Sequence, residues 1–161
     1  MIGRAERGTG DSDLGVLAGR LLFAVQGELF AALGALGFDD LTPRHGAVLA
    51  YLTPDGVRAT ELSRLSGQHK QVIGTLIDEL TSLGYVERRP DTADRRAKLI
   101  CPTGRGLAQM AAADRIMAAM QARHAERVGE DVYAEFKRVF SDITEHQRED
   151  ARTAAEPPAP V

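Results

Sequence analysis

The clearest hydrophobic pattern in the chain lies between residues 61 and 103. From residue 69 to residue 83, apolar side chains recur at spacings of three and four, which predicts a helix with one buried stripe. The residues of this stripe are Val72, Ile73, Leu76, Ile77, Leu80 and Leu83. Ser66-Gly67 predicts a turn that joins this helix to a shorter one before it. Gly84 predicts the helix end, because glycine tolerates the left-handed conformation there.

A short alternating stretch follows the second helix. Tyr85–Arg89 alternates like a strand, and Ala97–Cys101 can form its partner. Residues 90–96 between them form a polar turn, and Pro102 is expected to end the second strand because it cannot donate to the ladder. Helix, turn, helix and basic hairpin in this order predict a winged helix-turn-helix.

The first turns of the second helix carry short or hydrogen-bonding side chains with one cation. They are Gln68, His69, Lys70, Gln71, Gly74 and Thr75. Groups of this kind can reach base edges and phosphates in the major groove of DNA. An ordinary solvated helix face has the same composition, so this helix does not by itself establish DNA binding.

The hairpin is strongly basic. Between Arg88 and Lys98 five cations stand against two anions, Asp91 and Asp94. The cations are Arg88, Arg89, Arg95, Arg96 and Lys98. Arginine at the tip of a β-ribbon suits the narrow minor groove, where the negative potential is greatest. We interpret Asp94, two residues before Arg96, as an internal partner that holds the Arg96 guanidinium. A charged hairpin can also be a solvated loop, but its position after the helix pair favours a wing.

These residues occur in a familiar arrangement. The matching segments are Glu61-Leu62, Leu76-Ile77-Asp78-Glu79-Leu80, Gly84-Tyr85-Val86-Glu87-Arg88, Asp94-Arg95-Arg96-Ala97, Thr103-Gly104, and Leu41-Thr42-Pro43-Arg44-His45 followed by Val48-Leu49. Together they resemble the MarR family of bacterial transcriptional regulators, over roughly residues 13–143. The resemblance implies a homodimer with interlocking terminal helices, a recognition helix in each major groove and a wing arginine in each minor groove. By position, Arg96 is the wing arginine and Asp94 its partner. Gly46 and Pro102 depart from the usual pattern.

The flanking segments are helical and suited to association. One apolar stripe runs from Leu14 to Leu36 and another from Val132 to Ile143, with a break expected at Gly129. They offer more apolar surface than one small core needs, which favours a dimer. The expected organisation is a disordered tail (1–12), a dimerisation helix (13–40), the winged DNA-binding region (41–103), dimerisation helices (104–146) and a second disordered tail (147–161). The expected fold is therefore mainly α with a small β-hairpin wing.

Composition fits a small cytoplasmic globular protein. The 161 residues suit one domain, and we found no apolar stretch long enough for a membrane span and no signal-peptide core. The net charge of −3 is unevenly spread, since residues 58–98 carry +2 and the remainder −5. The single cysteine, Cys101, excludes an internal disulfide and is interpreted as a packed thiol, although a redox switch stays open. No catalytic, phosphate-loop or metal-binding motif is present, so neither an enzyme nor a cofactor is predicted.

The resemblance also implies a small-molecule cleft between the dimer helices and the winged region. Matching positions are Phe23, Phe30, His45, Gly46 and Leu49, a set that suits an aromatic or phenolic anion. The resulting hypothesis is a ligand-responsive repressor that binds a pseudo-palindromic operator in double-stranded DNA, with no membrane partner. Two alternatives stay open. One is a DNA-binding protein without a ligand, and the other is a winged-helix protein–protein interaction module that never meets DNA.

Overall fold

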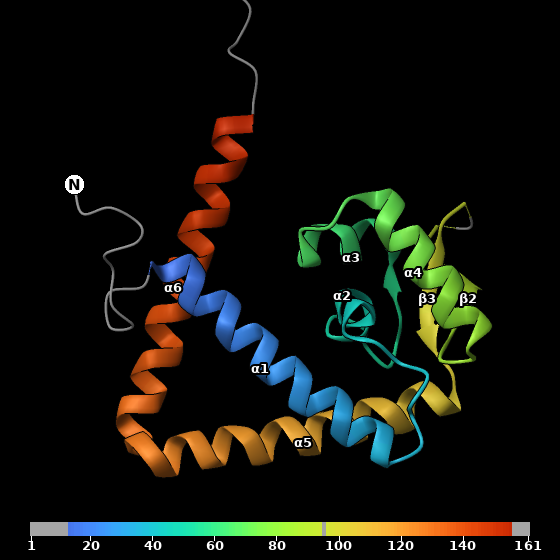
Figure 1. Ribbon diagram of the computed structural model, residues 1–161. Helices are drawn as coiled ribbons and strands as arrows, with labels where there is room; N and C mark the ends of the chain where they lie inside the picture. Colours follow the sequence, from blue (N-terminus) through green and yellow to red (C-terminus); the bar gives the residue numbers. More distant parts are fainter. Residues whose placement is uncertain (1–12, 95, 156–161) are drawn as a thin grey trace, which may run out of the picture. The chain divides into compact units, whose positions relative to one another are not determined.

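The computed structural model describes residues 13–94 and 96–155 (Figure 1). In chain order the elements are α1 (Leu14–Ala35), the 3-10 helix η1 (Pro43–His45), α2 (Gly46–Leu49), β1 (Val57–Arg58), α3 (Ala59–Ser66), α4 (Lys70–Ser82), β2 (Val86–Pro90), β3 (Lys98–Pro102), α5 (Gly104–Val128) and α6 (Glu130–Ala155). The chain divides into two compact units, with the boundary after Ile116 inside α5. The first unit contains the winged domain.

The winged domain is built on α4, as the periodicity predicted. Four residues of the predicted stripe are buried: Ile73, Leu76, Ile77 and Leu80. Leu83 is partly buried against the same cluster, which also takes in Leu62 of α3 and Ile100 of β3. Val72 is the exception, because 45% of it is exposed. It lies about 100° around the helix from Ile73, so the prediction that Val72 is buried was wrong.

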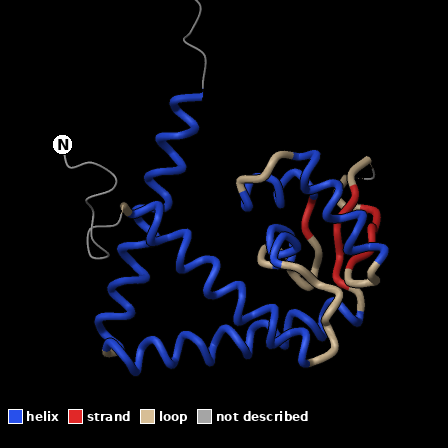
Figure 2. Tube along the Cα trace, in the orientation of Figure 1, coloured by secondary structure: helices blue, strands red, loops and turns tan. Residues whose placement is uncertain are grey.

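The wing is a three-stranded antiparallel sheet in the order β1-β3-β2, and its strands are the red segments of Figure 2. The central strand β3 pairs with β2 from Val86↔Pro102 to Pro90↔Lys98, which confirms the predicted hairpin within one residue at each end. On its other edge, β3 pairs Leu99 and Ile100 with the two residues of β1. The sequence did not predict β1, because two residues are too few to show an alternation. Pro102 is the last residue of β3, as expected.

Helix α1 also belongs to the first unit, and Leu33 is its only buried residue among those described. Its exposed large apolar residues are Leu14, Val16, Leu17, Leu21, Leu22 and Phe23. By length and by a hydropathy of 1.5 this helix could cross a membrane, so the prediction that no stretch is long enough was wrong. A helix that packs against protein can have the same composition, and the criterion alone does not identify a span.

The second unit holds the rest of α5 together with α6. Gly129, with φ of +95°, separates the two helices at the predicted break. Val132, Phe136, Val139 and Ile143 of α6 are exposed. Helix α6 continues to Ala155, so the predicted disordered tail from residue 147 is helical as far as that residue. The tail predicted for residues 1–12 lies outside the described residues, as do residues 156–161.

Candidate nucleic-acid interface

The turn before α4 is held by side chains of its own residues. Gly67 takes the left-handed conformation with φ of +69°, and Ser63 Oγ donates to the Gln68 carbonyl at 2.7 Å. His69 is the N-cap of α4, and its Nδ1 accepts the Gln71 amide at 3.4 Å. The cap leaves the predicted contact residues of this helix exposed: Gln68, His69, Lys70, Gln71 and Thr75.

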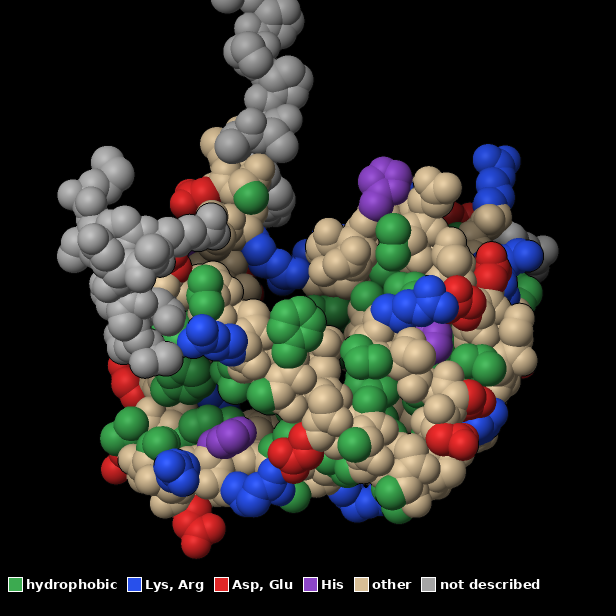
Figure 3. Space-filling model, viewed as in Figure 1, with side chains coloured by type: hydrophobic (Ala, Val, Ile, Leu, Met, Phe, Trp, Pro, Cys, Tyr) green, Lys and Arg blue, Asp and Glu red, His purple; other side chains and the backbone are tan. Residues whose placement is uncertain are grey.

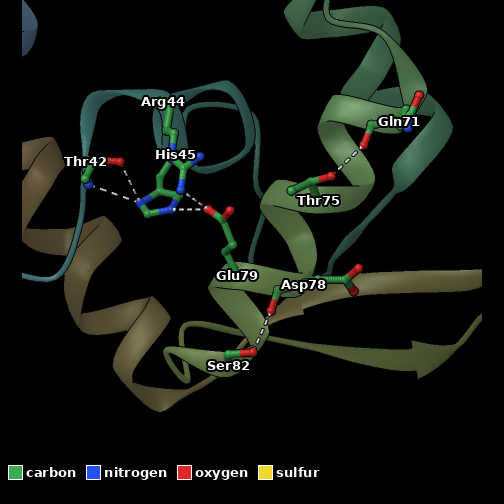
Figure 4. A network of polar contacts seen from close by, with 8 residues as sticks. All are labelled: Thr42, Arg44, His45, Gln71, Thr75, Asp78, Glu79 and Ser82. Carbon is green, nitrogen blue, oxygen red and sulfur yellow. Dashed lines mark hydrogen bonds and ion pairs between the residues drawn. The ribbon is translucent and has the colours of Figure 1, made fainter.

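A polar network ties the middle of α4 to η1 (Figure 4). His45 is 3% exposed, and its Nδ1 accepts the backbone amide of Thr42 at 3.1 Å. An accepting nitrogen carries no proton, so Nε2 is the protonated nitrogen and donates to Glu79 Oε2 at 3.2 Å. Arg44 pairs with the same carboxylate oxygen at 2.7 Å. The network ties α4 to η1 through Glu79, which lies one turn beyond Thr75 on the same helix face.

The base of the wing is held by an ion pair that the sequence did not reveal. Asp91 is buried, and its carboxylate accepts from Arg58 Nε at 2.8 Å. The same carboxylate accepts the Ala93 amide at 2.8 Å. The Ala93 amide and the Arg58 guanidinium hold the pKa of Asp91 below its ordinary value. The wing is thereby tied to β1, which lies on the far side of the sheet.

The wing tip is closed by backbone hydrogen bonds. The Ala97 amide donates to the Asp94 carbonyl at 2.9 Å, and the Asp91 amide donates to the Ala97 carbonyl at 3.1 Å. Asp94 Oδ1 accepts the backbone amide of Arg96 at 3.1 Å. The contact described for Asp94 is therefore with the Arg96 backbone and not, as expected, with its guanidinium. Arg96 is exposed, while Arg95 lies outside the described residues.

Two of the predicted wing cations make ion pairs within the chain. Arg88 pairs with Asp78 of α4 at 2.7 Å, and Arg89 Nε bonds Glu87 at 2.8 Å. Exposed pairs of this kind are weak, about 0–1 kcal/mol, so a phosphate can replace the carboxylate. Lys98 is exposed at the start of β3. Basic and acidic side chains are accordingly interspersed over the winged domain (Figure 3).

The start of α5 is joined to the wing through Tyr85. The buried Tyr85 phenol donates to Asp40 Oδ1 at 2.5 Å, and Arg105 pairs with Asp40 Oδ2 at 3.0 Å. The Arg105 guanidinium lies 4.3 Å from the Tyr85 ring centroid. Burial raises the pKa of Asp40, but the bonds from Tyr85 and Arg105 outweigh it and leave the pKa below its ordinary value. Burial and Asp40 raise the pKa of Tyr85. The sequence did not predict this cluster.

The predicted ligand residues have varied environments. Phe23 is 73% exposed, whereas Phe30 and Leu49 pack partly buried against the core of the winged domain. Gly46 lies near α1, because a Cβ built on it would meet Gln26 Nε2 at 4.0 Å. A further polar group, Gln109 Oε1 of α5, is buried without a hydrogen-bond partner in the described part of the chain.

This arrangement can be compared with known proteins. The model of the MarR family matches residues 39–97, which take in α2, α3, α4, β2 and the wing tip. The MarR family protein Rv2887 of Mycobacterium tuberculosis, solved with salicylic acid, is 30% identical. The match covers 83% of this chain and 97% of that one, with a TM-score of 0.58. This chain belongs to the MarR family.

Two further structures resemble this MarR-family chain. CouR from Rhodococcus jostii RHA1, bound to p-coumaroyl-CoA, is 29% identical over 82% of this chain and 92% of that one, with a TM-score of 0.68. CouR bound to a 23-mer DNA duplex matches at 24% identity over the same shares, with a TM-score of 0.66. No curated protein matches the chain. The chain is a DNA-binding transcriptional regulator with a winged helix-turn-helix, and MarR regulators are not enzymes.

Proposed function

We propose that the chain is a dimeric, sequence-specific and ligand-responsive repressor, with α4 in the major groove and Arg96 in the minor groove of its operator. The proposal rests on one observation: the start of α4 and the tip of the wing are both exposed and belong to the same winged domain. The first turns of α4 are polar and exposed, and Arg96 is exposed at the end of a hydrogen-bonded wing tip. Gln68, His69, Lys70, Gln71 and Thr75 are assigned to bases and phosphates, and Arg88, Arg89, Arg95, Arg96 and Lys98 to the backbone and minor groove.

The dimer in this proposal is formed by segments 13–40 and 104–146, and segment 41–103 binds DNA. The exposed apolar residues of α1 and α6 support this division, because a large exposed apolar surface on a soluble protein marks an interface. The protein acts where bacterial DNA lies, so we place it in the cytoplasm. The interaction-module alternative loses its support once the family is known to bind DNA.

DNase footprinting tests the proposal directly. A two-fold dimer should protect a pseudo-palindrome whose half-site centres are about 10 base pairs apart, or one helical turn. The two half-sites should be protected together as the protein is titrated. Protection of a single isolated half-site contradicts the two-fold dimer, and the absence of any preferred site contradicts sequence-specific binding.

The wing assignment predicts the effect of one arginine. Arg96→Ala should weaken operator binding by roughly 1–3 kcal/mol, because the side chain enters the minor groove. Asp94→Ala should weaken it less, through loss of the Asp94 bond to the Arg96 amide. Titrations at fixed salt measure both. Arg115→Ala is the matched control, since Arg115 is an exposed arginine on α5 outside the wing. An unchanged affinity for Arg96→Ala removes the wing assignment.

An aromatic acid or its acyl thioester is the proposed effector. Support comes from two similar regulators, CouR with p-coumaroyl-CoA and Rv2887 with salicylic acid, and from the positions of Phe23, Phe30, His45, Gly46 and Leu49. Gln109 Oε1, which has no hydrogen-bond partner in the described part of the chain, offers a polar group for orientation.

Gly46 provides the test of this site. Gly46→Trp should fill the space beside α1 and blunt release from the operator by effector, while binding without effector survives. Gly46→Ala is the control, because its Cβ meets only an ordinary contact with Gln26. The measurement is operator affinity with and without a panel of aromatic acids. If no compound shifts operator affinity or melting temperature of the unmodified protein, there is no basis for an effector site.

A further inference from the structure

Val72 is an apolar side chain on the exposed face of α4. Residues at spacings of three and four lie on one helix face, which places Val72 beside Thr75 and the N-cap residue His69. Both of these side chains are polar, and Val72 is 45% exposed. The helix buries its own stripe without this residue, since Ile73, Leu76, Ile77 and Leu80 supply the core contacts. Packing of the winged domain therefore gives no reason for a valine at this position.

The neighbouring threonine adds to the apolar character of the same place. Thr75 is one turn further along α4, and its hydroxyl donates to the Gln71 carbonyl at 3.1 Å. Its hydroxyl proton is therefore committed to the helix backbone (Figure 4). What Thr75 offers outward is a methyl group and an accepting oxygen, not a donor. Val72 and Thr75 together form a small apolar spot, with the exposed Gln71 one turn before Thr75 and the exposed His69 one turn before Val72.

The chemistry of the major groove identifies what fits this spot. Base edges present donors and acceptors there, and the one apolar group among them is the C5-methyl of thymine. A valine that replaces water around that methyl discriminates thymine from cytosine and, on the same strand, from either purine. A partner protein is a poorer fit, because one valine among polar side chains is far smaller than a protein interface.

We propose that Val72, supported by the Thr75 methyl, recognises a thymine methyl in each operator half-site and is thus a specificity-determining residue of this regulator. The inference rests on the proposed placement of α4 in the major groove. It predicts a thymine in each half-site at the position that faces Val72 and Thr75. The Gln68 and Gln71 amides read adjacent base edges.

Replacement of thymine by deoxyuridine tests the contact, because it removes only the methyl. In the footprinted operator, each thymine of one half-site is replaced in turn, and affinity is measured for the unmodified protein and for Val72→Ala. One position should weaken the unmodified protein by roughly 4-fold, the value of one buried methyl-sized group. At that position Val72→Ala should bind thymine and uracil operators equally. Gln71→Ala is the matched control and should keep the 4-fold preference.

The outcomes separate the inference from the function on which it rests. If no operator is protected in the first place, sequence-specific binding fails and the contact fails with it. If the operator is protected but every deoxyuridine substitution is silent, the thymine contact alone is overturned. It is also overturned if Val72→Ala keeps the full preference for thymine, because the methyl is then read by another residue. Circular dichroism and the melting temperature of Val72→Ala should match the unmodified protein, since an exposed valine-to-alanine change removes little packing.

Discussion

Gly106→Ala should destabilise the winged domain by about 3 kcal/mol, at the upper end of what an added core methyl costs. A Cβ on Gly106 would lie 2.1 Å from the Tyr85 carbonyl oxygen and 3.1 Å from Pro102 Cβ. The Tyr85 oxygen cannot easily move, because it accepts the Thr103 amide at 3.0 Å and its own side chain is bound to Asp40. The substitution therefore forces the start of α5 away from Tyr85, which lies between α4 and β2.

Gly104→Ala is the matched control for this prediction. It adds the same methyl two residues earlier in the same helix, where nothing lies within 4 Å of the new Cβ. Neither glycine has a positive φ, so backbone strain does not distinguish the two substitutions. Urea unfolding should give nearly the unmodified midpoint for Gly104→Ala and a much lower one for Gly106→Ala. Equal midpoints for both variants would show that the close approach of Gly106 to Tyr85 is relieved at no cost.

The elements that the sequence predicted well are those with a local signal. Helix α4 shows a full stripe, and β2 and β3 follow each other with a polar turn between them, so neighbours in sequence are neighbours in space. The strand β1 had no such signal because it gains its definition from pairing with β3. The hydrophobic periodicity gave one wrong prediction, the burial of Val72. Periodicity shows which residues share a face, but not where the neighbouring elements stop covering it, and Val72 lies beyond that edge.

Long-range polar partners were the least predictable part of the candidate site. Arg58 and Asp91 lie 33 residues apart, and His45 and Glu79 lie 34 apart, so no spacing rule connects them. Asp94 shows the opposite difficulty. Its nearness to Arg96 suggested a side-chain pair, yet the backbone amide of Arg96 is the group it binds. Aspartate in a tight turn commonly accepts an amide two residues on, and Asp94 does so here.

The flanking helices were predicted as elements, but their surroundings were not. The apolar stripes predicted for α1 and α6 agree with the helices found. Each helix exposes large apolar side chains that no other element of the described chain covers. The sequence predicted a disordered tail at the charged end of α6, which has no large apolar residue between residues 147 and 155. Helices with many charged residues can be stabilised by pairs along their own surface, as Arg138 with Glu135 and Asp142 illustrates in α6.

The largest functional effect is expected from removal of α6. A chain that ends at Val128 keeps every residue assigned to DNA but loses the exposed Val132, Phe136, Val139 and Ile143. Burial of such side chains against a second subunit contributes roughly 1.5–3 kcal/mol each before entropy is subtracted. Without them the dimer should dissociate at micromolar concentration. Operator affinity should then fall towards its non-specific level, roughly a thousand-fold or more, because one winged domain contacts only one half-site.

A point substitution separates loss of the interface from damage caused by truncation. Phe136 stacks on Tyr133 and Phe140 with ring centroids 6.4 and 5.6 Å apart, in the middle of the exposed face of α6. Phe136→Glu places a charge there and should give a monomer that keeps its helical content. Ser141→Glu, an equal charge at an exposed polar position of the same helix, should stay dimeric and bind the operator normally. Light scattering measures all three proteins. A full-length protein of 17.4 kDa in solution would contradict the dimer and the half-site spacing derived from it.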